Sequence, residues 1–218
     1  TNTDDGSGGV TLGDVTVGAA VQTAEYDAVG RRTVRQIQNS AYLDATYHYY
    51  FDSQRVVELR NGSDAVLKQY TWGLTYIDEL CQIALNDDPA DGTEDDCETD
   101  LYALQNANFN VLAVVRAVYD SGISANVPEM VERYEYSPYG ERTVYFSTGS
   151  DDPLCSAPTS MSRRSDLSIG SSLGVVATAG HPYGLCEVGH QGLFHDESLG
   201  THGGLIHNRA RTLHPRIG

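Results

Sequence analysis

The chain contains the stretch Tyr26-Asp27-Ala28-Val29-Gly30-Arg31-Arg32-Thr33-Val34, whose residue order is that of a β-hairpin. Tyrosine and aspartate end one strand, two residues turn the chain, and glycine supplies a backbone conformation that other residues avoid. Arginine then opens a strand that returns toward the aspartate. A similar stretch follows at Tyr136-Ser137-Pro138-Tyr139-Gly140-Glu141-Arg142-Thr143-Val144, and a degraded form without the glycine at Phe51-Asp52-Ser53-Gln54-Arg55. A repeated hairpin predicts a protein built as a surface of strands.

The composition also favours strands. The 218 residues can form one domain with a substantial core, and they include 14 tyrosines against 4 phenylalanines and 1 tryptophan. Tyrosine suits a half-buried sheet, where the ring packs and the hydroxyl reaches water. Because no segment shows a convincing helical period, we expect an all-β fold with little helix. Its antiparallel β-hairpin repeats should form a curved sheet strip or a segment of a shell.

The chain divides into four parts by composition. Residues 1–9 are polar and glycine-rich and predict a flexible lead or linker. Residues 10–148 carry the hairpin pattern and predict the strip of strands. Residues 149–174 are rich in Ser, Asp, Gly and Pro and predict a long loop. Residues 175–218 form a C-terminal hairpin region that holds six of the seven histidines.

The charge of the chain is strongly acidic. It has 14 Lys and Arg against 30 Asp and Glu, a formal net charge of -16, and Lys68 is its only lysine. Such a surface repels phosphate backbones and anionic lipid, which disfavours nucleic-acid and membrane partners. No run approaches the roughly 20 apolar residues that a membrane span needs, so we expect no membrane insertion. A solvated surface is the plainer interpretation, and solubility in salt or cation binding are the alternatives.

Four cysteines, Cys81, Cys97, Cys155 and Cys186, are spaced too widely for a zinc ribbon or a Cys-x-x-Cys redox pair. Cys81 and Cys97 bracket one acidic loop, where a disulfide would join the two ends of a hairpin. A Cys155–Cys186 disulfide follows only by elimination. Disulfides imply an oxidising compartment, which predicts a secreted, extracellular or cell-surface protein. The chain begins at Thr1 without methionine, from which we expect a processed product or a fragment.

The acidic loop is the strongest candidate for a metal site. Asp87, Asp91, Asp95 and Glu98, with Gly92 between them, reproduce most of the spacing of an EF-hand calcium loop. Pro89 occupies a ligand position, however, and the flanking residues look like strands rather than helices. The sequence therefore favours a solvated acidic hairpin tip without a cofactor, and calcium binding is the alternative.

Several blocks together resemble the RHS or YD-repeat family, in the order of its C-terminal core region. They are the two Tyr-Asp or Tyr-Ser hairpins above and the blocks Tyr102–Val111, Glu132–Gly140, Gly189–Glu197 and Leu205–Arg211. The resemblance covers about Tyr26 to Gly218. It implies hairpin strips that spiral into a hollow shell, which encloses toxic domains in secreted proteins or lies at the cell surface. Thr201-His202-Gly203-Gly204 looks like an insertion relative to the family pattern.

The resemblance carries no catalytic residue onto this chain. Family cores continue into an aspartate-proline segment that cleaves the chain, whereas the present sequence ends at Arg216-Ile217-Gly218. No nucleophile elbow is present, so we predict that the protein is not an enzyme. Zinc is a weaker interpretation of the histidines, because most of them lie in blocks that the resemblance explains as hairpin framework.

The motif arginines and aspartates are best explained as structural. Arginines beside strand ends usually hold turns and cross-strand acids, which applies to Arg31, Arg142, Arg209 and Arg211 with Asp27 and Asp196. A strip of about five hairpins leaves unpaired backbone at both ends. We therefore expect partners at these edges: other segments of a longer RHS chain, in a secreted shell, or copies of the chain itself, in a fibre or tube. An enzyme or a calcium-dependent binding domain is the third hypothesis.

Overall fold

The computed structural model describes residues 11–12, 15–16, 22–38, 44–86, 97, 99–148, 160–163, 185–196, 205–208 and 211–214. The fold is all-β and antiparallel, as the sequence predicts. The strands are β1 (Thr11–Leu12), β2 (Val15–Thr16), β3 (Gln22–Tyr26), β4 (Arg32–Ile37), β5 (Ala45–Asp52), β6 (Arg55–Asn61), β7 (Val66–Trp72), β8 (Leu80–Leu85), β9 (Thr99–Gln105), β10 (Val111–Asp120), β11 (Ala125–Tyr136), β12 (Arg142–Thr148), β13 (Ser160–Arg163), β14 (Phe194–Asp196), β15 (Leu205–Asn208) and β16 (Arg211–Leu213).

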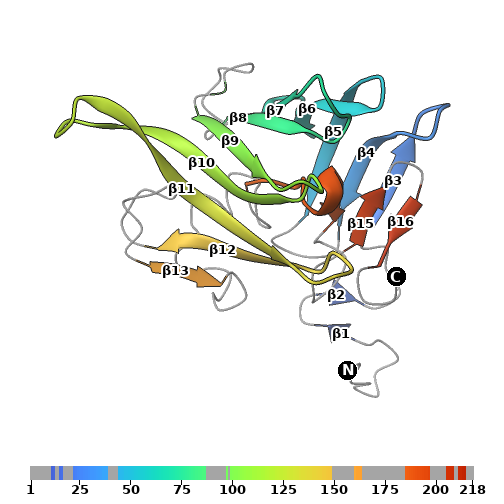
Figure 1. Cartoon of the computed structure of the whole chain (residues 1–218). Helices are drawn as coiled ribbons and strands as arrows, with labels where there is room; N and C mark the ends of the chain where they lie inside the picture. Colours follow the sequence, from blue (N-terminus) through green and yellow to red (C-terminus); the bar gives the residue numbers. More distant parts are fainter. Residues whose placement is uncertain are drawn as a thin grey trace.

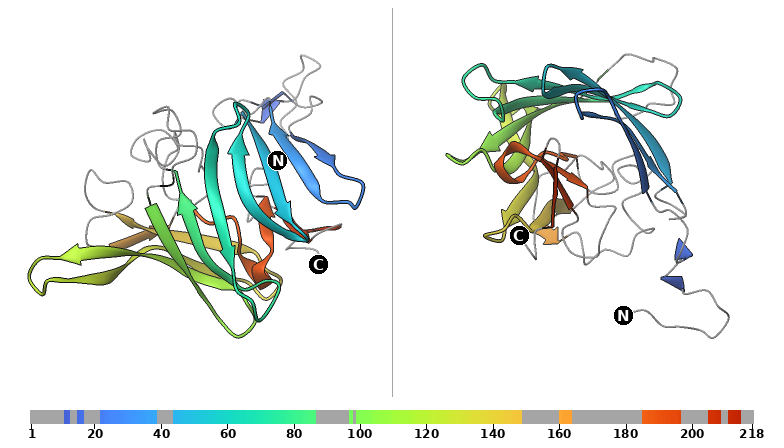
Figure 2. Two further views of the ribbon diagram at one scale, coloured as in Figure 1. Left: turned by 90° about the horizontal axis from the view of Figure 1, so that it is seen from above. Right: turned by 90° about the vertical axis from the view of Figure 1, so that its right-hand side faces the viewer.

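The main sheet has 11 strands in the order β13-β12-β11-β10-β9-β8-β7-β6-β5-β4-β3, so each strand pairs with its neighbours in sequence. This is the meander that consecutive hairpins produce. Figure 2 shows the sheet curving around β14, β15 and the 3-10 turn η3 (His190–Gly192). A small sheet of order β14-β15-β16 therefore lies on the concave side of the strip (Figure 1). No helix in the described part of the chain is long and apolar enough to cross a membrane.

The first hairpin of the sequence has the expected turn. Asp27 accepts hydrogen bonds at Oδ1 from the backbone N–H groups of Val29 (3.0 Å) and Arg31 (2.9 Å), and Gly30 has φ of +83°. Ser137 accepts in the same way from Glu141 N–H (3.0 Å), and Gly140 has φ of +87°. The side chain that begins the turn thus replaces a backbone acceptor, and glycine relieves the strain of the left-handed residue.

The same turn recurs with a residue other than glycine at the left-handed position. Asn61 Oδ1 accepts from the N–H groups of Ser63 (2.9 Å) and Ala65 (3.0 Å), with Asp64 left-handed at φ +68°. Asn106 Oδ1 likewise accepts hydrogen bonds from two backbone N–H groups of its own turn, in which Phe109 is left-handed at φ +58°. The shared feature is therefore the capping side chain at the first position, not the glycine at the fourth.

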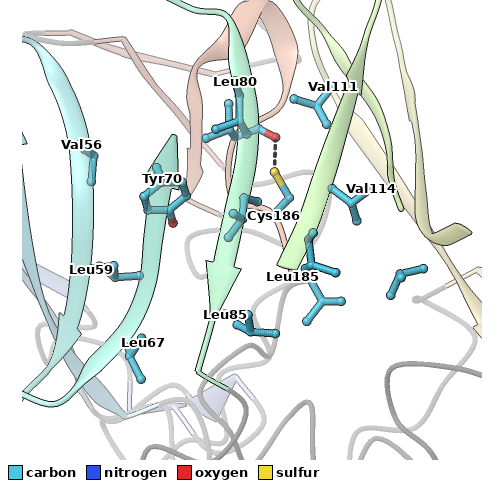
Figure 3. Close-up of a cluster of buried hydrophobic side chains, with 14 of the residues drawn as sticks. Val56, Leu59, Leu67, Tyr70, Leu80, Leu85, Val111, Val114, Leu185 and Cys186 are labelled. Atoms are coloured by element: carbon cyan, nitrogen blue, oxygen red, sulfur yellow. Dashed lines mark hydrogen bonds between the residues drawn. The ribbon is translucent and has the colours of Figure 1, made fainter. Parts of the chain in front are cut away.

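The core lies between the concave face of the sheet and the segment of residues 185–196, hereafter the C-terminal segment. Figure 3 shows Leu185 and Cys186 among the buried side chains of the strands, such as Tyr70 and Val114. Val111, Val114, Ile83 and Leu101 are fully buried, and they lie on β8, β9 and β10 in the interior of the main sheet. The opposite face of the sheet carries exposed Tyr50, Tyr102 and Leu112.

Candidate functional site

The C-terminal segment is attached to the sheet by buried charged groups, and we call this set of contacts the clamp. At one end Asp196 receives hydrogen bonds from the guanidinium groups of Arg32 and Arg35, both on β4. All three residues are at most 6% exposed. The Arg32 guanidinium lies 5.0 Å from the ring centre of Tyr49, and that of Arg35 lies 4.6 Å from that of Tyr47. Aromatic faces thus complete the surroundings of both cations.

The pKa of Asp196 reflects this arrangement. Burial by itself would raise the pKa of the carboxyl, but the attraction of Arg32 and Arg35 outweighs it, so the pKa lies below its ordinary value. Asp196 is therefore ionised in the fold, and its charge is compensated by two cations at the same point.

Lys68 on β7 makes the second contact of the clamp. Its Nζ donates to Leu185 O (2.8 Å) and to Glu187 Oε1 (2.5 Å), and the lysine is completely buried. Tyr70, two residues further on the same strand, donates its hydroxyl to Glu187 Oε2 (3.0 Å). A buried ammonium is tolerated only when it is paired, and here both of its acceptors come from the C-terminal segment.

Strands β11 and β12 supply the third contact. Glu132 is 1% exposed and accepts at Oε2 from the backbone N–H of Leu185 (2.8 Å) and from the Tyr134 hydroxyl. Arg142 on β12 donates to Cys186 O (2.7 Å). The sheet thus binds backbone N–H and C=O groups of the C-terminal segment as well as its carboxylates.

The segment is also folded on itself. His195 N–H donates to Glu187 O (2.8 Å), and His190 N–H donates to His195 Nε2 (3.0 Å). Burial, together with the nearby Arg142, lowers the pKa of His195 well below its ordinary value, so the ring is neutral and its Nε2 can act as the acceptor. The contacts at Glu187 and Asp196 therefore belong to one hydrogen-bonded unit.

The clamp holds no activated nucleophile among its described residues. Cys186 is fully buried and donates its S–H to Val188 O (3.1 Å), a bond dashed in Figure 3, and burial raises the pKa of its thiol to about 12. Burial likewise raises the pKa of Tyr70 well above its ordinary value. Thiol and phenol are both protonated at neutral pH, a state that suits packing and hydrogen bonding rather than nucleophilic attack.

A small cavity of about 100 Å³ lies beside the clamp, with Phe51, Trp72, Phe194 and the arginines Arg31 and Arg55 in its wall. It is smaller than the pockets of roughly 300–1,000 Å³ that hold drug-sized ligands. Arg31 is bonded to Asp27 (2.6 Å) and to Ser53 O (2.5 Å), and Arg55 to the carbonyls of Tyr76 (2.9 Å) and Ile77 (3.1 Å). These arginines fix neighbouring hairpin tips to one another.

The motif residues of the sequence lie in two places. Asp27, Gly30 and Arg31 form a hairpin tip next to Tyr26, which is 53% exposed. Gly140 and Arg142 face the C-terminal segment, as does Tyr136, which donates its hydroxyl to Val111 O (2.7 Å) and packs beside His190 and His195. Arg211 lies in β16 and is described by its backbone alone, and Arg209 lies outside the described residues.

The predicted calcium ligands Asp87, Asp91, Asp95 and Glu98 also lie outside the described residues, so the calcium site stays a prediction. Within the described ranges no three His, Cys, Asp or Glu side chains gather as metal ligands. Neither predicted disulfide is present among the cysteines that the structure describes. Cys81 is exposed, Cys97 half-buried and Cys186 enclosed in the core with its sulfur bonded to Val188 O, while Cys155 lies outside the described ranges.

The sequence analysis missed the clamp residues Arg32, Arg35, Lys68, Glu132 and Glu187. One signal was available: Lys68 has the same parity along its strand as Val66 and Tyr70, which are both buried. A charged residue at an inward position of a strand indicates a partner on the opposite side of the core.

No family model and no curated protein matches this sequence. The fold and the clamp by themselves define an all-β protein whose curved antiparallel sheet is covered on its concave face by its own C-terminal segment.

Proposed function

We propose that the protein is a non-enzymatic structural module, a wall segment of a secreted shell of the RHS or YD-repeat type. The observation that carries the proposal is the clamp. A strip of hairpins can bend and twist in many ways, whereas this strip is held to one curvature by contacts of the C-terminal segment to β4, β7, β11 and β12. A wall that encloses a space needs a fixed curvature of this kind.

The energetics of the clamp support a structural role. Pairing buried charges seldom adds net stability, but breaking such a pair costs about 3–5 kcal/mol because a charge is left uncompensated. The clamp therefore adds little net stability when the C-terminal segment is in place, but displacing the segment costs a large free energy. It specifies one arrangement of sheet and segment, as an encapsulating module requires.

The edge strands of the main sheet would also have partners in such a shell. Strands β3 and β13 end the sheet, and each has a strand on only one side in the described part of the chain. Unpaired strand edges attract other strands. In a shell, other hairpins of a longer chain would pair with them, in a secreted or cell-surface setting.

The shell proposal is tested on the natural polypeptide. Mass spectrometry of native material should find these residues within a longer chain, and electron microscopy should show hollow particles of that chain. A natural polypeptide with the mass of these 218 residues alone would overturn the shell proposal.

The two open edges favour a second candidate, a subunit that adds strand to strand in a fibre or tube. This arrangement is open-ended, so it predicts particles that grow in length with concentration. Sedimentation velocity at micromolar concentration separates the candidates, because a stable monomer excludes the fibre.

A further inference from the structure

A two-stranded arm extends from the main sheet, formed by residues 116–120 of β10 and 125–129 of β11 (Figure 1). β9 pairs with β10 only between Val111 and Val115, and β12 pairs with β11 only from Glu132 onward. Within the described residues, therefore, each strand of the arm has only the other beside it. Isolated two-stranded hairpins are marginal in water, and this one exposes Tyr119 and Ile123, each at 64%.

The two edges of the arm are not equivalent, because Pro128 lies on β11. Pro128 is paired with Ala117 in a register that is unbroken from Val115↔Met130 to Asp120↔Ala125. Proline has no N–H, so an unbroken ladder places it at a pair without hydrogen bonds, with its nitrogen directed away from β10. The β11 edge thus lacks a donor at this point, which discourages strand addition.

The same register fixes which groups the β10 edge offers. Hydrogen-bonded and non-hydrogen-bonded pairs alternate along an antiparallel ladder. Since Ala117 lies at a non-hydrogen-bonded pair, so does Tyr119, whose partner is Asn126. The N–H and C=O groups of Ala117 and Tyr119 therefore point outward from β10, ready to accept another strand.

The charges along this edge fit a second copy of the edge itself. We propose that the protein forms a symmetric dimer in which two β10 edges pair antiparallel about Val118. This register places Arg116 opposite Asp120 of the copy on both sides of the two-fold axis. It also places Ala117 opposite Tyr119, the two residues whose backbone groups point outward.

Neighbouring registers of the two β10 edges would form fewer hydrogen bonds or fewer charge pairs. A shift by one residue pairs outward-pointing groups with inward-pointing ones, so hydrogen bonds are lost. A shift by two residues in either direction keeps the hydrogen bonds but removes the Arg116–Asp120 pairs. Arg116 also bonds Glu129 through Nε (3.0 Å), and a guanidinium has five donors, so one cation can serve both carboxylates.

The dimer is expected to be weak. Five residues from each copy bury far less than the roughly 1,600 Å² of a stable complex, so we expect a dissociation constant on the order of 100 μM. Each chain carries a net charge of -16, and about 0.5 M salt is needed to screen the repulsion between copies. The pairing does not depend on the proposed function, and unlike a fibre it stops at two copies.

Sedimentation equilibrium of the full chain from about 5 μM to 1 mM tests the dimer, with Tyr119→Pro as the principal variant. It removes an outward N–H and should leave the protein monomeric at 1 mM, since symmetry removes two hydrogen bonds at once. Asn126→Pro is the matched control: it alters the same cross-strand pair but on the β11 edge, and should change the dissociation constant less than twofold. Tyr119→Thr keeps the N–H and should still dimerise.

Asp120→Asn tests the charges. It keeps the acceptor for Gly122 N–H (2.7 Å) within the turn and should raise the dissociation constant about fivefold. A wild-type chain that is monomeric at 1 mM, one that grows beyond two copies, or a loss of dimer in Asn126→Pro equal to that in Tyr119→Pro would each overturn the proposal. Thermal unfolding of every variant shows whether the fold itself is retained.

Discussion

Replacing Asp196 with asparagine is expected to release the C-terminal segment from the sheet. The Asp196 side chain is 5% exposed and those of its partners Arg32 and Arg35 are 4% and 7% exposed, so the change leaves two buried cations without a counter-charge. Breaking a buried pair costs about 3–5 kcal/mol. Asparagine keeps one acceptor oxygen, which places the expected loss near the lower value, about 3 kcal/mol.

Two measurements detect this loss of stability. Urea unfolding monitored by circular dichroism gives the free energy of unfolding, and for a chain of this size the melting temperature should fall by about 6–12 °C. Acylation of Lys68 gives the opening of the segment itself, because this only lysine is completely buried and bonded to Leu185 O and Glu187. If the free energy of opening falls by about 3 kcal/mol, acylation of Lys68 becomes about 100-fold faster.

The matched control is Glu135→Gln. Glu135 pairs with Arg133 at 3.1 Å, but the two side chains are 53% and 44% exposed, so the expected effect is below about 1 kcal/mol. Labelling of Lys68 should then change less than twofold. If Asp196→Asn costs no more than Glu135→Gln, or if it destabilises the protein without exposing Lys68, the clamp does not hold the segment and the reasoning fails.

Two further predictions concern residues that touch the C-terminal region. Burial, with the nearby Arg32, lowers the pKa of His207 to about 4, so between about pH 6.5 and 4 the unfolded chain binds more protons than the folded one. Stability should fall as the pH falls through this window, and His207→Gln should flatten the dependence of the urea midpoint on pH; an unchanged slope would contradict this. Gly30 and Gly140 have nearly equal φ, +83° and +87°, but only at Gly140 would an added Cβ lie 2.8 Å from atoms of His190 and Ile206. Thermal unfolding should show about 1 kcal/mol of loss for Gly30→Ala and about 2–4 kcal/mol for Gly140→Ala, and equal losses would show that the close packing is unimportant.

The hairpins could be predicted because their information is local. A capping acid, two turn residues and a glycine lie within five positions, as Asp27 and Gly30 show. In two turns of the same geometry, Asp64 and Phe109 take the left-handed position although neither is glycine. There the Asn61 and Asn106 side chains hold the turn, and the strain of one residue is offset by the hydrogen bonds of another.

The clamp could not be predicted because its partners are distant in sequence. Lys68 and Glu187 are 119 positions apart, and Arg32 and Asp196 are 164 apart. Strand parity identifies Lys68 as an inward charge, but nothing in a single sequence chooses its partner among 30 acids. That choice depends on the three-dimensional fold, in which β4 and β7 both contact the same C-terminal segment.

The distribution of charge in the fold gives the clamp a further role. Four of the described cations, Arg32, Arg35, Lys68 and Arg142, are buried on the concave side, whereas the chain as a whole carries a net charge of -16. They outnumber Glu132 and Asp196, the carboxylates buried with them. A carboxylate-bearing segment such as Glu187 to Asp196 is therefore attracted to the concave face. This excess of positive charge thus directs the C-terminal segment to the concave side, where the buried pairs then fix the curvature of the sheet.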